Sequence, residues 1–170
     1  MFSMIIAIGI SASILRAKAT LDESRFKPEY FTRNRKMPFE KLLKFMLSMN
    51  KTSTQNALNK FFEKEGITIS QQALSKARNK FDHTPFLKLY NAIRDAYYSS
   101  EYIATLDKLH NKFVIAIDGS DTPLPNLPGL RDKFGGTGAK ASSPTARMSI
   151  AYDVTNDFIM DADFSPLTVS

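Results

Sequence analysis

The sequence predicts an α+β protein in which a helical region, residues 1–110, precedes a region of antiparallel strands, residues 111–170. Two observations support this prediction. Up to His110 the apolar residues recur every three or four positions, the period of a helix, whereas from Lys112 onward they run or alternate as in strands. The turn residues Val154–Asp157 separate two strand-like runs and so predict a hairpin. A chain of 170 residues fits one domain, or a small domain and part of another.

The composition is that of a globular protein with a core of its own. Hydrophobic residues make up 43% of the chain, which is a typical fraction. Cysteine is absent, which excludes disulfides and thiolate metal sites and favours the reducing cytoplasm. The apolar segment Met1–Leu15 is too short to span a membrane and lacks the basic start of a signal peptide. We therefore expect a first buried helix there, or sequence read from upstream of the domain, and no membrane partner.

Basic residues are concentrated in the N-terminal half. From Arg16 to Lys80 there are 15 Lys and Arg against 6 Asp and Glu, a balance of +9, whereas Phe81–Ser170 has 8 against 11, a balance of −3. This asymmetry favours a polyanion-binding module followed by an acid-bearing one. The alternative is that the basic helices simply expose solvated faces.

Four helices are predicted after the first, each from an apolar stripe and a start or stop signal. The signals are Pro38 and Pro85 at first helical positions, Thr52 or Ser53 and Ser70 as N-caps, and Gly66 as a C-terminal stop. The stripes are Phe39, Leu42, Leu43 and Met46; Ala57, Leu58, Phe61 and Phe62; Ala73, Leu74 and Ala77; and Phe86, Leu89, Tyr90, Ile93 and Tyr97.

The second and third of these helices span residues 52–80 and have helix-turn-helix proportions. The outer face of the third carries amide and basic side chains, the types that reach base edges and phosphates. The basic turn Arg33–Lys36 is a candidate phosphate clamp, with an exposed linker as the alternative. The candidate DNA-binding residues are Arg33, Arg35, Lys36, Gln71, Gln72, Lys76, Arg78 and Lys80.

Three strands are expected in the C-terminal region, at Lys112–Ile117, Arg147–Asp153 and Phe158–Phe164. Between the first two lies Thr122–Thr145, which holds four prolines and four glycines. We expect this segment to be a long loop without a stable helix, and loops of this length are usually functional or disordered.

Asp118 is the strongest candidate for chemistry. It follows an apolar run directly, so we expect it at the end of a buried strand, where a carboxylate needs a cation or hydrogen-bond donors. Mg²⁺ suits such oxygen ligands. Asp121 can share that metal or cap the turn, whereas Asp161 and Asp163 are expected on a solvated strand face.

Several segments together resemble bacterial insertion-sequence transposases of the "IS four" type, which are DDE enzymes with an RNase H-like core. The resemblance runs from about Arg25 to the end of the chain, in the family's order and at similar spacing. The segments are Phe31–Phe39, Ala73–Lys80, Ala116–Asp121 with Leu124–Asn126, Ala151–Asn156 and Asp161–Ala162.

The resemblance implies that Asp118 is the first acid of the catalytic triad, with the other two acids located beyond Ser170. The family uses two Mg²⁺ ions for strand cleavage and transfer, and one carboxylate cannot hold both. We therefore expect an N-terminal fragment: a helical DNA-binding region followed by the first three strands of an incomplete RNase H-like fold. The resemblance also implies a bacterial cytoplasmic protein that binds double-stranded DNA at the ends of the insertion sequence. Such a protein can act alone, as a homodimer or in an oligomer with full-length transposase.

Three alternatives stay open. The chain can be a non-catalytic DNA-binding regulator or inhibitor of a full-length transposase. The segment Asp118–Thr122 also fits a metal-dependent adhesion motif, although Pro123, Pro125 and Pro128 argue against the helix that such a domain needs next. A haloacid dehalogenase-type phosphatase requires an acid where Ser120 stands.

Overall fold

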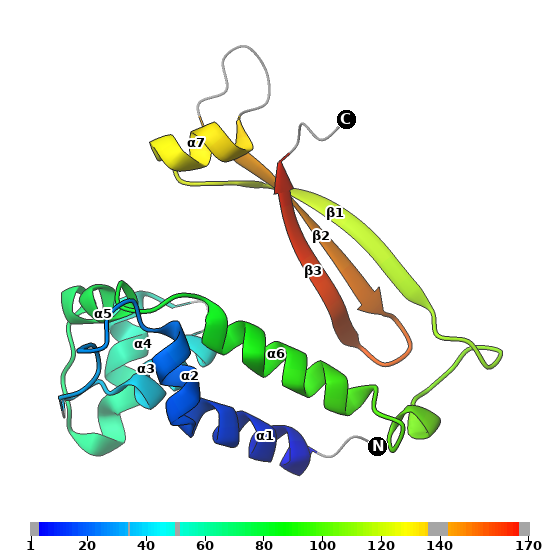
Figure 1. Ribbon diagram of the computed structural model, residues 1–170, viewed down its shortest axis with the longest axis horizontal. Helices are drawn as coiled ribbons and strands as arrows, with labels where there is room; N and C mark the ends of the chain where they lie inside the picture. Colours follow the sequence, from blue (N-terminus) through cyan, green and yellow to red (C-terminus); the bar gives the residue numbers. More distant parts are fainter. Residues whose placement is uncertain (1–3, 34, 50–51, 136–142, 167–170) are drawn as a thin grey trace. The chain divides into compact units, whose positions relative to one another are not determined.

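The structure, a computed structural model, describes residues 4–33, 35–49, 52–135 and 143–166. Seven α-helices and one three-stranded antiparallel sheet make up this described part (Figure 1), which confirms the α+β class. The chain divides into a helical unit, Met1–Ile103, and a sheet unit, Ala104–Ser170. The sequence placed this boundary at residue 110.

The helical unit holds six of the helices, with a short 3₁₀ turn, η1 (Glu63–Glu65), after the fourth. A second such turn, η2 (Ile103–Thr105), lies where the two units meet in the sequence. The helices are α1 (Met4–Arg16), α2 (Lys18–Ser24), α3 (Phe39–Leu47), α4 (Thr54–Phe62), α5 (Gln71–Arg78) and α6 (Thr84–Tyr97). None in the described residues is both long and apolar enough to cross a membrane.

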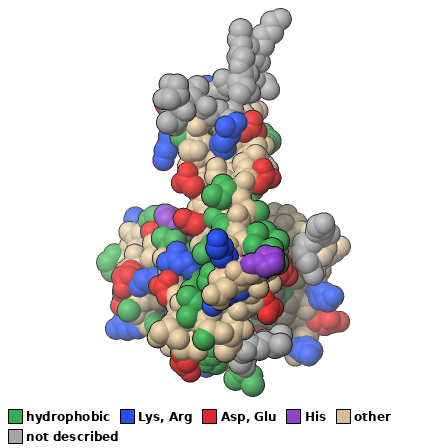
Figure 2. Space-filling view, turned by 90° about the vertical axis from the view of Figure 1, so that its right-hand side faces the viewer, with side chains coloured by type: hydrophobic (Ala, Val, Ile, Leu, Met, Phe, Trp, Pro, Cys, Tyr) green, Lys and Arg blue, Asp and Glu red, His purple; other side chains and the backbone are tan. Residues whose placement is uncertain are grey.

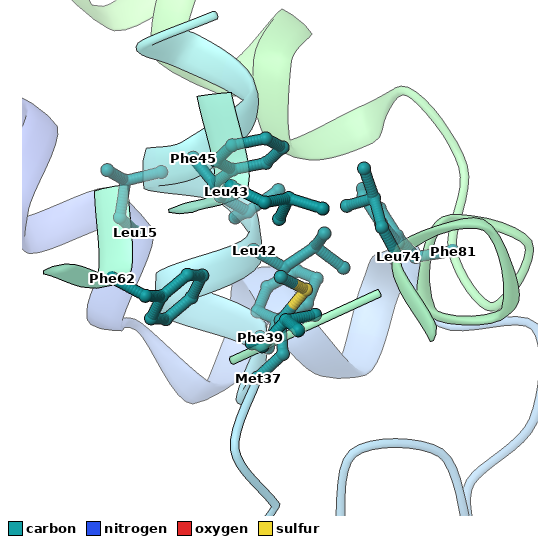
Figure 3. Packing of buried hydrophobic residues seen from close by; sticks show 11 residues of the cluster. Leu15, Met37, Phe39, Leu42, Leu43, Phe45, Phe62, Leu74 and Phe81 are labelled. Carbon is teal, nitrogen blue, oxygen red and sulfur yellow. The ribbon is translucent and has the colours of Figure 1, made fainter. Parts of the chain in front are cut away.

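The apolar core of this unit is built around α3 (Figure 3). Leu42 and Leu43 are fully buried, and Phe45 nearly so. The predicted stripe of this helix named Met46 in place of Phe45, but Met46 is only partly buried. The rest of the buried cluster comes from Phe39 at the start of α3 and from both sides of α3 in the sequence: Leu15, Met37, Leu58, Phe62, Ile69, Leu74 and Phe81.

The predicted helix signals around α4 and α5 are confirmed. The Ser53 and Ser70 hydroxyls accept hydrogen bonds from the backbone N–H groups of Asn56 and Ala73, at 3.4 and 3.2 Å, as N-caps do. Gly66 ends η1 with φ of 63°, a left-handed conformation that favours glycine. Ala73, however, is exposed and not inward as predicted, because it lines a surface cavity.

The sheet is a meander of β1 (Ile115–Pro123), β2 (Thr145–Asp153) and β3 (Phe158–Pro166), in that order. Both neighbouring pairs are antiparallel, and the β2–β3 hairpin is confirmed. The register shifts between Ala151 and Tyr152, where Asp161 and then Ile159 are the partners. Such a bulge increases the local twist of the strands.

Two predictions about this unit are wrong. The first strand begins at Ile115 and continues to Pro123, because Asp118–Pro123 pairs with β2 from Ile150 back to Thr145. The segment expected to be free of helix contains α7 (Pro128–Phe134). Its Pro128 stands in the first turn, where proline is compatible with a helix. Residues 136–142 of that segment lie outside the described residues.

Replacing Leu42 with Ala tests the core. The side chain is fully buried, so Leu42→Ala is expected to lower the free energy of unfolding of the helical unit by about 2–5 kcal/mol. Denaturant unfolding followed by helical circular dichroism measures this change. The matched control is Leu87→Ala in α6, where the side chain is 49% exposed and a loss below about 0.5 kcal/mol is expected. Equal losses in the two variants would contradict the packing described here.

Candidate functional site

A cavity of about 830 Å³ lies on the helical unit, between two segments that are far apart in the sequence. One segment comprises residues 29–33 and 35–38, and the other is 68–80; residue 34 of the predicted basic turn lies outside the described residues. Together they bring the predicted basic turn next to α5. The cationic residues that line the cavity are Arg33, Arg35, Lys36, Lys76 and Lys80, and Glu29 is the one acid among the lining residues described.

These five cations have no carboxylate partner within the described residues. Elsewhere in the unit carboxylates pair with cations: Arg16 Nε lies 3.1 Å from Glu40 Oε1 and Lys44 Nζ lies 2.6 Å from the same oxygen. The hydrogen bonds from Lys44 and Arg16 lower the pKa of Glu40. The positive charge around the cavity is therefore not neutralised locally, and it favours an anion there.

Two aromatic side chains form part of the cavity wall. The Lys80 ammonium lies 5.4 Å from the ring centre of Tyr30 and 6.0 Å from that of Phe31, within the range of cation–π attraction. The Phe31 ring packs edge-on against Phe39 and Phe81, with ring centres 5.2 and 6.1 Å away. The aromatic wall therefore contacts the buried core through Phe31 and the cation Lys80 through both rings.

The backbone of this wall is held in an unusual conformation. Phe31 has φ of 61°, which costs free energy for a residue with a bulky side chain. The Arg25 guanidinium donates a hydrogen bond to the Tyr30 carbonyl at 3.2 Å and also bonds the Asp22 carboxylate at 2.5 Å. These bonds and the Phe31 ring contacts fix the aromatic pair in place.

The other predicted DNA-binding residues lie outside this cavity. Gln71 and Gln72 are exposed on α5, and the Gln71 N–H donates to the Gln55 side chain at 3.3 Å, which ties α4 to α5. Arg78 lines a second cavity of about 510 Å³ together with His83. The predicted recognition face of α5 is therefore divided between two hollows.

The basic residues do not form one continuous stripe on the face shown in Figure 2. Lys and Arg side chains are interspersed there with Asp, Glu and apolar side chains. The larger of the two cavities described above is lined by five cationic side chains.

Asp118 does not end a buried strand, contrary to the prediction. It is the fourth residue of β1 and pairs with Ile150, which pairs in turn with Ala162. Asp118 is exposed, and its neighbour Ile117 is 78% exposed. The Asp118 carboxylate accepts a hydrogen bond from the Gly119 N–H at 2.8 Å. Asp118 therefore lies on an exposed strand, and its cross-strand neighbours Ile150 and Ala162 are apolar.

The predicted metal pair, Asp118 and Asp121, is split between the two faces of β1. Residues three apart in a strand point to opposite faces, and Asp121 instead pairs with Arg147, with Nε and Oδ1 3.3 Å apart. The register places Asp161 and Asp163 on the face of Asp121. The described residues contain no group of three His, Cys, Asp or Glu able to hold a metal. One carboxylate beside Ile150 does not fit a two-magnesium centre.

The sequence prediction missed the role of Asp153, which is fully buried. Its Oδ1 accepts hydrogen bonds from the N–H groups of Thr155 and Asn156, both at 3.2 Å, and from the Thr155 hydroxyl at 2.8 Å. The Asn156 amide donates to Asp153 Oδ2 at 2.9 Å. The Asn156 amide also donates to the Asp107 carbonyl oxygen, and its own oxygen accepts from the Asp107 N–H. Asp followed two residues later by Thr is a turn signature that could have indicated this network.

The same turn contains a second carboxylate contact. The Tyr152 hydroxyl donates a hydrogen bond to Asp157, and this bond is the main cause that raises the pKa of Tyr152. Asp157 has φ of 56°, a conformation that Asp tolerates better than most residues. Turn chemistry thus accounts for Asp157, as the sequence predicted.

Comparisons with known protein families, with curated proteins and with solved structures found no significant match. The likeness to transposases therefore stays a prediction from the sequence motifs. The geometry of the cavity and of β1 is the ground for the function proposed below.

The split of Asp118 and Asp121 is testable with Mn²⁺ as a paramagnetic probe. We expect weak binding at Asp118 that broadens the Gly119 amide resonance, because the Asp118 carboxylate lies against that N–H. Asp118→Asn should abolish the broadening, whereas Asp121→Asn, on the other face, should leave it unchanged. Loss of the broadening in both variants would mean that the two acids share an ion.

Asp153→Ala is expected to destabilise the hairpin by about 2 kcal/mol or more, because two backbone N–H groups lose their acceptor. Amide hydrogen exchange of β2 and β3 measures the change as faster exchange. Asp163→Ala is the matched control, since Asp163 is an exposed carboxylate in β3 and its loss should leave the exchange rates nearly unchanged. Unaltered exchange in Asp153→Ala would show that the network contributes little.

Proposed function

We propose that the helical unit binds double-stranded DNA, and that the chain is the DNA-binding part of a transposase of the "IS four" type. One observation carries this proposal: Arg33, Arg35 and Lys36 of the predicted phosphate clamp line one cavity together with Lys76 of α5 and Lys80, which follows α5. The sequence assigned both groups to DNA independently, about 40 residues apart. Their convergence makes a single contact surface the simplest explanation.

The chemistry of the cavity suits a phosphate backbone. Lys and Arg that neutralise phosphates release condensed counterions, so binding weakens steeply as the salt concentration rises. Cations already held by carboxylates contribute less to such binding. The five around the cavity have no such partner in the described residues, so they are available to a polyanion.

In the sheet unit we propose that β1–β3 correspond to the first strands of an RNase H-like fold, with Asp118 as the first catalytic acid. The antiparallel meander supports this proposal in its topology alone. On the face of Asp118, the described strand residues offer no second carboxylate. We therefore assign DNA binding, and no strand cleavage, to the described part. Any metal clamp would need acids from elsewhere, in this chain or in a partner.

The cations around the cavity also favour a second candidate function. In this function the chain is a cytoplasmic regulator or inhibitor that binds the same DNA ends as a full-length transposase. The two functions differ in chemistry and agree in DNA binding. A nicking assay with Mg²⁺ or Mn²⁺ separates them, because a regulator gives no cleavage at any metal concentration, whereas the catalytic function requires cleavage once the missing acids are supplied from elsewhere. Cleavage that Asp118→Asn abolishes would favour the catalytic function.

The binding proposal predicts a change in salt dependence. The double variant Lys76→Ala, Lys80→Ala should bind a short duplex more weakly, and its slope of log affinity against log salt should fall by about 2 if each lysine contacts one phosphate. Fluorescence anisotropy at several salt concentrations measures the slope.

The matched control is Lys60→Ala, Lys64→Ala, which removes the same charge from exposed positions of the same unit outside the cavity. Its slope should stay close to that of the unaltered protein. Equal slopes in the two double variants would show that only the net charge matters and would overturn the assignment of the cavity. Circular dichroism confirms that both variants fold.

A further inference from the structure

We infer that the cavity receives an unpaired nucleotide of a DNA strand, with the base against Tyr30 and the phosphate at Lys76 and Lys80. This inference rests on the proposed DNA binding and names the part of the DNA that enters the cavity. It is carried by the combination, at one site, of an apolar interior, an aromatic wall and a group of cations that have no carboxylate partner among the described residues.

The cavity interior is more apolar than phosphate contact alone requires. Besides the cations, it is lined by Met37, Pro38, Ile69, Ala73 and Ala77. Its volume of about 830 Å³ falls in the range of about 300–1,000 Å³ found for ligand sites. An intact duplex presents its phosphates at the surface and keeps its bases stacked, so it cannot fill such an interior. An unstacked base can.

The aromatic wall is suited to stacking. Bases in single strands bind by stacking on aromatic side chains, with backbone phosphates held in a basic groove. In the structure the Lys80 ammonium lies over both Tyr30 and Phe31, and Lys27 lies 6.0 Å from the ring centre of Tyr30. A base that stacks on Tyr30 would displace an ammonium from the ring, and the ammonium would then pair with the phosphate of that nucleotide.

The wall is also preorganised, which limits the entropy lost on binding. Arg25 holds the Tyr30 carbonyl at 3.2 Å, and the bridge between Arg25 and Phe81 fixes this segment to the chain after α5. Phe31 keeps its left-handed backbone because its ring is wedged against Phe39 and Phe81. A wall that served only as an exposed linker would not need these constraints.

The test compares three DNA probes of matched length and charge: a blunt duplex, a duplex with an unpaired thymidine extension, and a duplex with an abasic extension that keeps the phosphates. The full chain should bind the thymidine extension at least about fivefold more tightly than the abasic one. Tyr30→Leu should remove this ratio and Tyr30→Phe should keep it, because Phe retains the aromatic face. Tyr98→Leu, an aromatic change outside the cavity, is the control.

The outcomes separate this inference from the proposed function. Equal binding of thymidine and abasic extensions by the unaltered protein would overturn the inference without any variant, and would leave phosphate contacts as the whole interaction. Failure of the unaltered protein to bind any probe, or a salt slope insensitive to Lys76 and Lys80, would overturn the DNA-binding proposal itself. A ratio that persists in folded Tyr30→Leu would place the base elsewhere.

Discussion

The cavity of the helical unit depends on the packing of two distant segments, residues 24–33 with 35–39 and residues 69–82. Phe39 and Phe81 pack edge-on with ring centres 5.4 Å apart, and Phe31 contacts both. Backbone bonds reinforce the contact: the Phe26 N–H donates to the Lys80 carbonyl at 3.0 Å, and the Asp82 N–H donates to the Ser24 carbonyl at 3.1 Å. The apolar contact thus sets the distance between the cations of the turn and the cations Lys76 and Lys80. The geometry of the cavity follows from burial in the core beside it.

The sheet unit is stabilised differently. The buried cluster of the protein lies wholly within Leu15–Phe81, whereas β1 exposes apolar side chains such as Ile117 to solvent. A three-stranded meander with little apolar burial relies on its hydrogen-bond ladder and on its turns, and such small sheets need a covered face to be stable alone. This places unusual weight on Asp153, whose buried carboxylate joins the hairpin turn to Asp107 through Asn156.

Local signals were sufficient to predict α3, α4, α5 and α6. Ser53, Ser70 and Gly66 each act on groups within a few residues, so their roles could be predicted without knowing the fold. The position of Asp118 could not be predicted in this way, because the end of a strand depends on where its partner strand stops pairing. Here β2 pairs with β1 as far as Pro123, and Gly119 does not interrupt the ladder. The helix α7 was missed because prolines were taken only as helix breakers, although Pro128 suits a first turn. The cavity could not be predicted from the sequence, because it depends on the contact between Phe39 and Phe81, which are far apart in the chain.

The free energy of unfolding does not explain why the cavity cations have no carboxylate partner in the described part of the chain. Exposed ion pairs contribute roughly 0–1 kcal/mol each, so adding carboxylate partners would alter stability little. The absence of carboxylate partners has a larger effect on the electrostatic potential. Several like charges that line one hollow with apolar walls add up to a stronger positive potential there. The Glu40 carboxylate, which pairs with both Arg16 and Lys44, shows that the same unit neutralises cations elsewhere. A hollow in which five cations lie beside a fixed aromatic wall suits a ligand that is both anionic and planar, which is the chemistry of the nucleotide proposed above.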